Sequence, residues 1–458
     1  MLLVALADSG STAHPIWIAP FVALLLCIAL LPLLRRTAHW WEHNRNKLLV
    51  SLALAGVTLA YTATRGPGEG GLSGLSAVLH LLEHAILGEY VPFLALLLSL
   101  YVVAGGLSLR GDIPATPAAN TTLLAIGGLV ASLIGTTGAA MVLIRPLLRI
   151  NRERKHVAHT VIFFIFIVCN VGGSLLPLGD PPLFLGYLRG VPYFWTLALW
   201  PGWALMLGAL LAVYWAWDVL AHRRELTRDI ERDETEIIPL SLIGGVNFAW
   251  LAVIVLATAL VDPSRPIIGT GWTPPPYLRE GIQLAAAGLS LLTTPRAARA
   301  DNDFNYVAIG EVACLFLGIF VTMQTPIELL HAAGPALARA GYTHPWQFFW
   351  ASGMLSSFLD NAPTYVVFFE TACRIAPPEG AVLVALTDGD LVRADHLVAI
   401  SYGAVFMGAN TYIGNGPNFM VRSIAEQAGV RMPSFFGFMA YSGLILIPLL
   451  LVITFALL

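Results

Sequence analysis

Long apolar segments alternate with short polar ones along most of the chain, and their length is that of membrane-spanning helices. A helix needs about 20 apolar residues to cross a bilayer. Segments of roughly this kind lie at 16–34, 47–64, 90–109, 193–217, 242–261, 279–293, 304–325 and 434–457. The pattern therefore predicts an all-α polytopic membrane protein.

Two further segments, 158–188 and 397–424, are apolar at both ends but are interrupted by glycine, proline and polar residues. The first contains Asn170-Val-Gly-Gly-Ser-Leu-Leu-Pro-Leu-Gly-Asp-Pro-Pro182, and the second contains Gly408-Ala-Asn-Thr-Tyr-Ile-Gly-Asn-Gly-Pro-Asn-Phe419. Proline removes backbone donors and glycine tolerates unusual dihedral angles, so we expect both helices to break here. Broken helices at membrane depth are tolerated only where the freed backbone is buried in protein or lines a water-filled cavity.

The two breaks also resemble each other. Leu178-Gly-Asp-Pro-Pro-Leu-Phe184 aligns with Ile413-Gly-Asn-Gly-Pro-Asn-Phe419, so that a glycine, a proline and a phenylalanine coincide and Asp180 lies opposite Asn415. Paired interrupted segments in the two halves of a chain indicate the binding site of a transporter. Two unrelated proline kinks are the alternative.

Two other apolar segments, about 119–146 and about 346–372, carry polar centres at 132–139 and 356–363. We expect each to form a re-entrant hairpin rather than a crossing. With this topology most of the 25 basic residues fall in loops on one side of the membrane. By the positive-inside rule that side is cytoplasmic, and both termini lie outside. If the two polar-centred segments crossed the membrane instead, the basic residues would be divided more evenly between the two sides.

The same topology predicts an inverted repeat. Residues 1–217 and 239–458 each contain three spans, a hairpin, a broken helix and a final span, in opposite orientations. The mixed-charge segment 218–238 is expected to be a solvated cytoplasmic linker. Inverted repeats with broken helices are typical of secondary transporters.

Composition supports a membrane protein and excludes other classes. Hydrophobic residues make up 57% of the chain and charged residues 12%, whereas soluble domains are about 25% charged. A net charge of −3 without a basic tract gives no indication of nucleic-acid binding. The four cysteines are scattered without a CxxC pair, and the segment Met1 to Pro15 lacks the basic region of a signal peptide, so we expect the first span to be retained.

Polar residues in the hairpin tips and breaks are the candidate site. Hard cations such as Na⁺ prefer oxygen ligands from carboxylates, amides, hydroxyls and backbone carbonyls. The candidate ion- and substrate-binding residues are Thr136, Thr137, Gly172, Gly173, Ser174, Asp180, Asp360, Asn361, Thr364, Asn410, Thr411, Asn415 and Asn418, with Ser132 as a further hydroxyl. For any single Ser, Thr or Asn, the alternative is that it satisfies a freed backbone group.

Asp180 and Asp360 are the expected Na⁺ ligands, because a carboxylate inside a membrane is costly unless it is functional. Burial favours the protonated carboxyl and a bound cation favours the ionised one, so the same site can exchange Na⁺ for H⁺. Glu311, inside the span 304–325, is a candidate proton relay; its alternative is a hydrogen bond to a neighbouring helix or an interfacial position. No cofactor other than the coupling ions Na⁺ and H⁺ is expected.

His80-Leu-Leu-Glu83-His84 matches the H-x-x-E-H pattern of zinc peptidases. Five-residue patterns arise by chance, and an amphipathic surface helix explains the segment better. We therefore expect no enzyme.

Several motifs resemble the ion transporter superfamily: Thr136-Thr-Gly-Ala-Ala140, the 170–182 break, Glu311-Val-Ala-Cys-Leu-Phe-Leu-Gly-Ile-Phe320, Asp360-Asn-Ala-Pro-Thr364 and Asn415-Gly-Pro-Asn418. Within it the chain looks most like NhaD-type sodium/proton antiporters and the neighbouring citrate and arsenite carriers. The resemblance implies a homodimer with a scaffold domain and a transport domain. The transport domain would contain both hairpins and both broken helices and would move like an elevator.

The family motifs are matched by Thr136, Thr137, Gly172, Gly173, Asp180, Asp360, Asn361, Pro363, Asn410, Asn415 and Pro417. The dicarboxylate branch carries Ser-Asn-Thr at both hairpin tips, whereas here the tips read Gly-Thr-Thr-Gly and Asp-Asn-Ala-Pro. An acid at a tip repels a carboxylate substrate unless a cation lies between them.

The leading hypothesis is therefore a sodium/proton antiporter of the bacterial inner (plasma) membrane with Asp180 and Asp360 as carriers. The alternative is a Na⁺- or H⁺-coupled anion carrier for citrate, another dicarboxylate or arsenite. The partners expected are membrane lipid, a small ion substrate and a second copy of the chain, and no nucleic acid.

Overall fold

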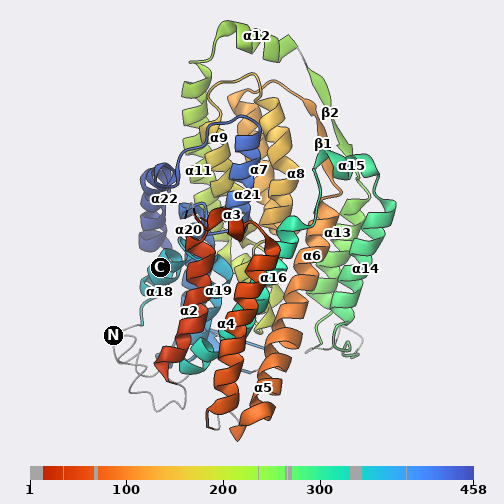
Figure 1. The fold of residues 1–458 in the computed structure, drawn as a ribbon. Helices are drawn as coiled ribbons and strands as arrows, with labels where there is room; N and C mark the ends of the chain where they lie inside the picture. The colour runs from red at the N-terminus through yellow and green to blue at the C-terminus, as the bar shows by residue number, and fades with distance from the viewer. Residues whose placement is uncertain are drawn as a thin grey trace. The chain divides into compact units, whose positions relative to one another are not determined.

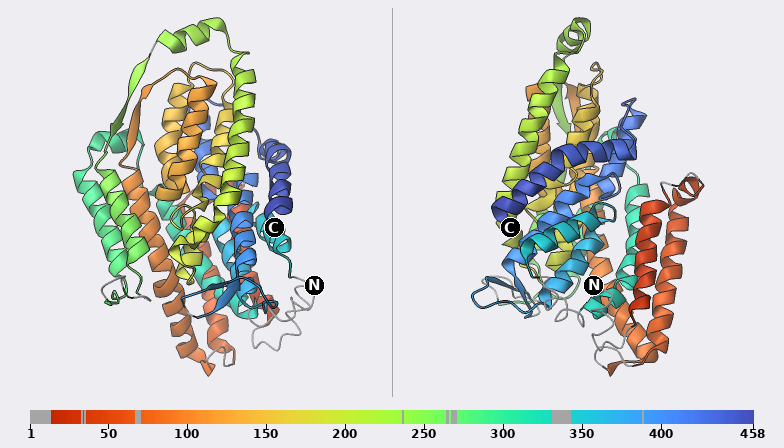
Figure 2. Two further views of the ribbon diagram at one scale, coloured as in Figure 1. Left: turned by 180° about the vertical axis from the view of Figure 1, so that it is seen from behind. Right: turned by 90° about the vertical axis from the view of Figure 1, so that its left-hand side faces the viewer.

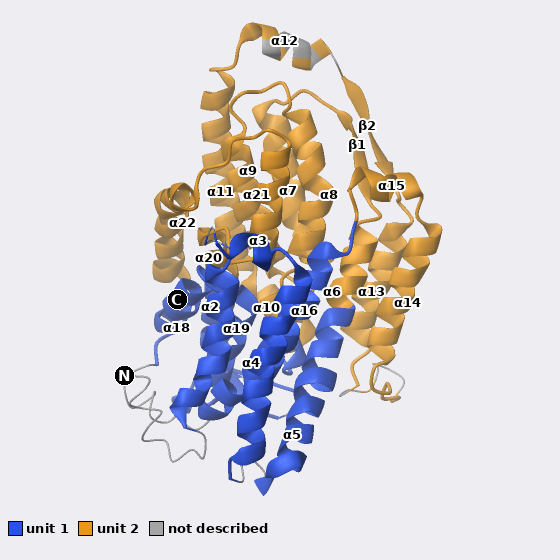
Figure 3. Ribbon diagram, in the orientation of Figure 1, with its two compact units in different colours: residues 1–95, 185–191, 305–404 blue, residues 96–184, 192–304, 405–458 orange. Residues whose placement is uncertain are grey.

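The computed structural model of the protein describes residues 14–32, 34, 36–66, 71–235, 237–263, 266, 271–330, 343–387 and 389–458 (Figure 1, Figure 2). The chain divides into two compact units. Unit 1 contains residues 1–95, 185–191 and 305–404, and unit 2 contains residues 96–184, 192–304 and 405–458 (Figure 3).

Among the residues that the structure describes, six helices are long and apolar enough to cross a membrane. They are Asn44–Thr64, Gly74–Ala104, Pro117–Ile134, Tyr193–His222, Val307–Leu330 and Phe435–Leu457. Shorter apolar helices occupy Pro15–Leu30, Ala158–Ser174 and Asn247–Leu260. The protein is thus a mostly helical integral membrane protein.

Unit 1 is built around the pairing of α4 and α16. Its elements are η1 (Pro15–Ile18), α2 (Ala19–Leu30), α3 (Ala38–Trp41), α4 (Asn44–Thr64), α5 (Gly74–Leu82), the π-helix η3 (Glu83–Tyr90), the start of α6 (Val91–Ala104), the end of α10 (Pro181–Leu188), α16 (Val307–Thr322), α18 (Pro345–Ser356), α19 (Asn361–Cys373), β3 (Leu383–Ala385), β4 (Leu391–Arg393) and most of α20 (Ala394–Met407). A Cβ on Gly318 of α16 would come within 2.7 Å of the Ser51 Cβ on α4, so a glycine is needed for this close approach. Phe93 and Phe316 stack with ring centroids 4.7 Å apart and join α6 to α16.

Unit 2 is built around α9. Its elements are β1 (Ser108–Asp112), α7 (Pro117–Ile134), α8 (Thr136–Ile150), α9 (Ala158–Ile167), η4 (Val171–Ser174), the start of α10, η5 (Tyr193–Leu199), α11 (Trp200–His222), α12 (Thr227–Thr235), β2 (Ile238–Ile243), α13 (Asn247–Leu260), α14 (Leu278–Thr293), α15 (Arg296–Asp301), η6 (Gly408–Asn410), α21 (Gly416–Gln427) and α22 (Phe435–Leu457). Every residue of α9 from His159 to Ile167 is buried, as expected for a helix that is apolar all round. α7, α11 and α21 pack on it (Figure 1).

Five of the eight expected spans, 47–64, 90–109, 193–217, 304–325 and 434–457, overlap helices that are long and apolar enough to cross a membrane. The expected spans 16–34 and 242–261 correspond to shorter apolar helices, and 279–293 corresponds to α14, whose 16 residues are too few for a candidate span. Two further differences concern the elements themselves. First, the chain is not purely helical: β1 pairs with β2 and β3 pairs with β4 in two short antiparallel sheets. The start of the expected span 242–261 belongs to β2, and α13 begins only at Asn247. The apolar residues of β2 made strand and helix indistinguishable by hydrophobicity alone.

Second, the expected span 90–109 is the later part of one long helix from Gly74 to Ala104 that includes the π-helix η3. The histidines and glutamates between residues 80 and 89 made this stretch look like an amphipathic surface helix outside the spans.

Each polar-centred segment is a pair of helices. α7 and α8 meet at Gly135, which has a φ of 81° that a non-glycine residue rarely adopts, and α18 and α19 are separated by residues 357–360. Their re-entrant course and the inverted repeat stay predictions. The segment 218–238, expected to be a linker, contains α12. Residue 236 of this segment lies outside the described residues, as do residues 1–13.

Candidate ion-binding site

Glycines shape the first break, which lies in unit 2. A Cβ on Gly172 would come within 2.6 Å of the Gly128 carbonyl oxygen, and one on Gly173 within 2.7 Å of the Thr136 Cγ2 atom. A Cβ on Gly179 would overlap the Gly173 carbonyl oxygen and approach the carbonyl carbon to 2.7 Å. The segment after α9 can therefore fold back on itself and against α7 and α8 only because these positions lack side chains.

This packing brings the first turn of α8 to Asp180. The Thr136 amide donates to the Gly179 carbonyl oxygen at 2.8 Å, and the Thr136 hydroxyl donates to Asp180 Oδ1 at 3.1 Å. Asp180 directly precedes Pro181, the first residue of α10, where a negative charge interacts favourably with the helix dipole. Both Thr136 and Asp180 are 1% exposed, so this carboxylate is inside the protein.

The second break contacts the same carboxylate. Asn415, the residue before α21, donates from Nδ2 to Asp180 Oδ1 at 3.2 Å, to the Cys169 carbonyl oxygen at 2.9 Å and to Asn170 Oδ1 at 3.3 Å. Two segments more than 230 residues apart therefore meet at Asp180.

Asn170 extends this contact, although it was not among the expected site residues. Its Nδ2 donates to Asn418 Oδ1 at 2.8 Å and to the Ile165 carbonyl oxygen at 2.8 Å. Asn418 in turn donates to the carbonyl oxygens of Gly408 and Thr411 at 2.9 and 3.0 Å. A carboxamide at the end of the apolar run 161–169 was the signal for Asn170 in the sequence.

Other expected residues satisfy backbone groups. The Ser132 hydroxyl donates to the Gly172 carbonyl oxygen at 2.5 Å, and the Ser174 hydroxyl to that of Val171 at 2.8 Å. The Thr411 hydroxyl accepts from the amides of Ile413 and Gly414, each at 3.2 Å. These bonds agree with the alternative that such side chains replace lost helix hydrogen bonds.

Two more expected residues border the breaks. Thr137 follows Thr136 in the first turn of α8 and is half-buried. The Asn410 carbonyl oxygen accepts from the Ser442 hydroxyl at 2.7 Å, which ties the second break to α22.

Asp360, Asn361 and Thr364 lie in unit 1, at the start of α19. The Asp360 carboxylate accepts from the Ala362 amide at 3.1 Å and caps the helix. The Thr364 hydroxyl donates to the Asp360 carbonyl oxygen at 3.1 Å, and Asn361 is fully buried. Asp360 belongs to unit 1 and Asp180 to unit 2, and their expected meeting at one Na⁺ site stays a prediction.

Glu311 of α16 has a charged partner. Its Oε1 lies 2.7 Å from Lys47 Nζ on α4, and the Lys47 side chain is 5% exposed against 42% for Glu311. An ion pair between neighbouring helices accounts for this acid, which corresponds to the alternative of an interhelical contact, and the relay role stays a prediction.

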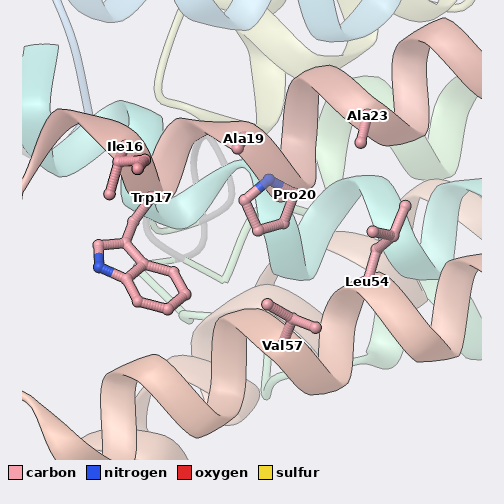
Figure 4. Close-up of a pocket in the computed structure, with 7 residues that line it drawn as sticks. All are labelled: Ile16, Trp17, Ala19, Pro20, Ala23, Leu54 and Val57. Atoms are coloured by element: carbon pink, nitrogen blue, oxygen red, sulfur yellow. The ribbon is translucent and has the colours of Figure 1, made fainter.

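Two other features belong to unit 1. Among the described residues, no group of three His, Cys, Asp or Glu could hold a metal ion, and His80, Glu83 and His84 are exposed on α5 and η3. A groove beside η1, α2 and α4 is lined by apolar side chains and the indole of Trp17 (Figure 4), so it offers no charged group to bind an ion or a carboxylate. Its residues are Ile16, Trp17, Ala19, Pro20, Ala23, Leu54 and Val57.

The comparisons with known proteins agree with a transporter. Residues 10–458 match the family described as "Putative citrate transport", and no curated protein matches the chain. The match confirms the expected superfamily and excludes the peptidase hypothesis, since the family consists of transporters. It also favours the anion-carrier alternative over the leading sodium/proton hypothesis. Because the match covers nearly the whole sequence, this protein belongs to the citrate transport family of the ion transporter superfamily and is a secondary transporter of a small solute.

Proposed function

We propose that this protein is a cation-coupled carrier of citrate or a related small polycarboxylate, with the coupling cation held at Asp180. The observation that carries the proposal is the meeting of both helix breaks at one buried carboxylate, which receives hydrogen bonds from Thr136 and Asn415. Carboxylates at membrane depth are expensive and mark ion pathways.

The groups around Asp180 suit a hard cation. Besides the carboxylate they include the Thr136 hydroxyl, the Asn170 carboxamide oxygen and the Cys169 carbonyl oxygen. Oxygen ligands of these kinds are the ones that alkali and alkaline-earth cations prefer. The cation is here a transported ion rather than a resident cofactor.

The same region suits an anion once a cation is bound. α8 begins at Thr136, in the first hairpin segment, and α21 begins at Gly416, in the second break. Thr136 and Asn415 both contact Asp180, so two helix N-termini, each with positive partial charge, start near this carboxylate. The carboxamide of Asn415 adds a donor at the start of α21. A cation at Asp180 would cancel the repulsion between this acid and a citrate carboxylate, which explains why carriage would be coupled.

The wider architecture of the proposal comes from the sequence. It comprises inverted repeats over 1–217 and 239–458, two re-entrant hairpins, an elevator movement within a homodimer, and extracytoplasmic termini in a bacterial inner membrane. The pairs α7–α8 and α18–α19, each interrupted at a polar segment, support the hairpins.

Uptake of radiolabelled citrate into proteoliposomes tests the proposal. We expect uptake that requires an inward Na⁺ or H⁺ gradient and that is lost in Asp180→Asn. Asp303→Asn is the matched control, because this acid of unit 2 has a side chain that is 77% exposed. Na⁺-driven proton movement without any citrate transport would establish the antiporter instead. Absence of polycarboxylate transport under every gradient would reject the proposal.

A further inference from the structure

Three buried asparagines in unit 2 form a chain of hydrogen bonds that ends at Asp180. Asn418, Asn170 and Asn415 are 0%, 0% and 3% exposed. Asn170 Nδ2 donates to Asn418 Oδ1 at 2.8 Å. Asn415 Nδ2 donates to Asn170 Oδ1 at 3.3 Å and to Asp180 Oδ1 at 3.2 Å. The three carboxamides are thus aligned, with the oxygen of one facing the nitrogen of another.

The second break fixes the far end of this chain. Asn418 Nδ2 donates to the carbonyl oxygens of Gly408 and Thr411 at 2.9 and 3.0 Å. A carbonyl oxygen can only accept a hydrogen bond, so the nitrogen end of the Asn418 carboxamide has to face these two groups. The oxygen end of Asn418 therefore faces Asn170.

The first break fixes Asn170 in the same sense. The Cys169 amide donates to the Phe164 carbonyl oxygen at 3.3 Å, one residue further back than in an α-helix. Asn170 Nδ2 donates to the next carbonyl oxygen, that of Ile165, at 2.8 Å. The nitrogen end of Asn170 thus meets one acceptor from each break, and its oxygen end faces Asn415.

This orientation determines which groups the cation site offers. Asn415 Nδ2 lies within 3.3 Å of three oxygen atoms. They belong to the Asp180 carboxylate, the Cys169 backbone and the Asn170 side chain. A reversed Asn170 carboxamide would replace one of these oxygens by N–H groups, which repel a cation. Because hard cations prefer oxygen ligands, the orientation of Asn170 decides whether this region suits a cation.

We propose that Asn418 is a positioning residue for the coupling cation, and that this cation is a metal ion of the Na⁺ type. Asn418 supplies no ligand; it holds the Asn170 carboxamide with its oxygen toward Asp180. A proton needs only one oxygen of Asp180, whereas a metal ion uses several, so only a metal ion depends on Asn170 in this way. The proposal rests on the proposed function, from which it takes the cation at Asp180, and adds the residue that orients the site.

Thermal unfolding in detergent at increasing NaCl tests the proposal, with choline chloride keeping the ionic strength constant. A ligand that binds the folded state raises its stability, so this assay measures Na⁺ binding without any substrate. Two variants of similar size separate orientation from packing. Asn418→Leu removes the acceptor that faces Asn170, whereas Asn418→Asp keeps an acceptor there but removes the donor to the carbonyl oxygens of the second break.

Both variants should lower the unfolding midpoint without Na⁺, because each removes the donor to these carbonyl oxygens. Only Asn418→Leu should weaken Na⁺ binding. One hydrogen bond between helices corresponds to roughly a 3- to 20-fold change in an equilibrium constant, so the half-saturating Na⁺ concentration should rise by this factor. In Asn418→Asp it should stay at or below the wild-type value.

The matched control is Asn120→Leu in the same unit. Asn120 is 1% exposed and donates to Asn151 Oδ1 at 2.9 Å. Its replacement should lower the unfolding midpoint and leave the half-saturating Na⁺ concentration unchanged.

The outcomes separate this proposal from the proposed function. Unchanged Na⁺ binding in Asn418→Leu would overturn the role of Asn418, as would weaker binding in Asn418→Asp or an equal shift in Asn120→Leu. Each Asn418 variant decides by itself if the other does not fold. Wild-type protein that Na⁺ does not stabilise would also overturn this role. Wild-type protein that binds Na⁺ but carries no citrate would reject the proposed function, and the two variants would still decide the role of Asn418.

Discussion

The substitution Asn415→Ala tests whether the contact between the two breaks holds the candidate site together. The Asn415 amide group has two hydrogens and lies within hydrogen-bonding distance of three buried acceptors: the Cys169 carbonyl oxygen, Asn170 Oδ1 and Asp180 Oδ1. Alanine removes both donors and leaves these acceptors to find other partners.

The magnitude follows from the number of bonds lost. Hydrogen bonds between helices in membrane proteins contribute about 0.6 kcal/mol on average and up to about 1.7 kcal/mol. Two such bonds correspond to a loss of about 1 to 3 kcal/mol. If this energy also positions Asp180 for the coupling cation, the apparent cation affinity falls roughly 5- to 150-fold, since about 1.4 kcal/mol is a factor of ten.

The matched control is Asn120→Ala in the same unit. Asn120 is 1% exposed, and its carboxamide donates to Asn151 Oδ1 at 2.9 Å and lies 3.4 Å from Asp218 Oδ2. It therefore loses a similar number of buried hydrogen bonds without touching Asp180. We expect both variants to lower the midpoint of thermal unfolding in detergent, but only Asn415→Ala to shift the cation concentration that gives half-maximal citrate uptake.

Two results would refute this reasoning. An unchanged cation dependence in Asn415→Ala would show that the contact does not position the cation site. An equal shift in Asn120→Ala would show that any loss of stability in unit 2 changes cation dependence.

Three further predictions concern stability. Gly179→Ala should prevent recovery of a monodisperse protein in size-exclusion chromatography, because its Cβ would overlap the Gly173 backbone carbonyl and force the backbone of the break to shift. Normal recovery would contradict the packing of the first break. Glu311→Gln should lower the unfolding free energy, because it leaves Lys47 buried without its charged partner. The expected loss lies between the ~1 kcal/mol of an exposed ion pair and the ~3 kcal/mol of a buried one. In thermal melts, the double variant Glu311→Gln, Lys47→Met should recover part of this loss. Between β1 and α15, a hydrogen bond from the Arg110 guanidinium lowers the pKa of Asp301. The contribution of this contact to stability is therefore present above the ordinary carboxyl pKa and is lost as the pH falls through the lowered pKa. Melting curves against pH should show a smaller acid-induced loss of stability in Asp301→Asn than in the wild-type protein.

The Asp180 contact shows how far the candidate site could be predicted. Glycine and proline in 170–182 and 408–419 predicted two breaks, because a helix cannot continue through these residues. Their likeness predicted a shared role. The atoms that meet could not be predicted, since Asn415 reaches Asp180 only through the packing of α21 on α8 and α9.

Glu89 shows the opposite case. Glutamates and histidines between residues 80 and 89 reduce local hydrophobicity, so the sequence pattern indicated an external segment before a span at 90–109. In the folded protein Arg189 neutralises the charge of Glu89, and Gln324 donates a hydrogen bond to it. Glu89 can therefore be buried within a single helix from Gly74 to Ala104.

The sequence by itself determined the class of the protein, the approximate limits of its helices and the positions of the breaks, because these depend on the hydrophobicity and backbone preferences of consecutive residues. The tertiary structure alone decided which polar groups share a buried site, that β1 pairs with β2, and that Lys47 neutralises Glu311. These depend on contacts between residues far apart in the chain, and no local pattern specifies which charge will meet which partner once the helices pack.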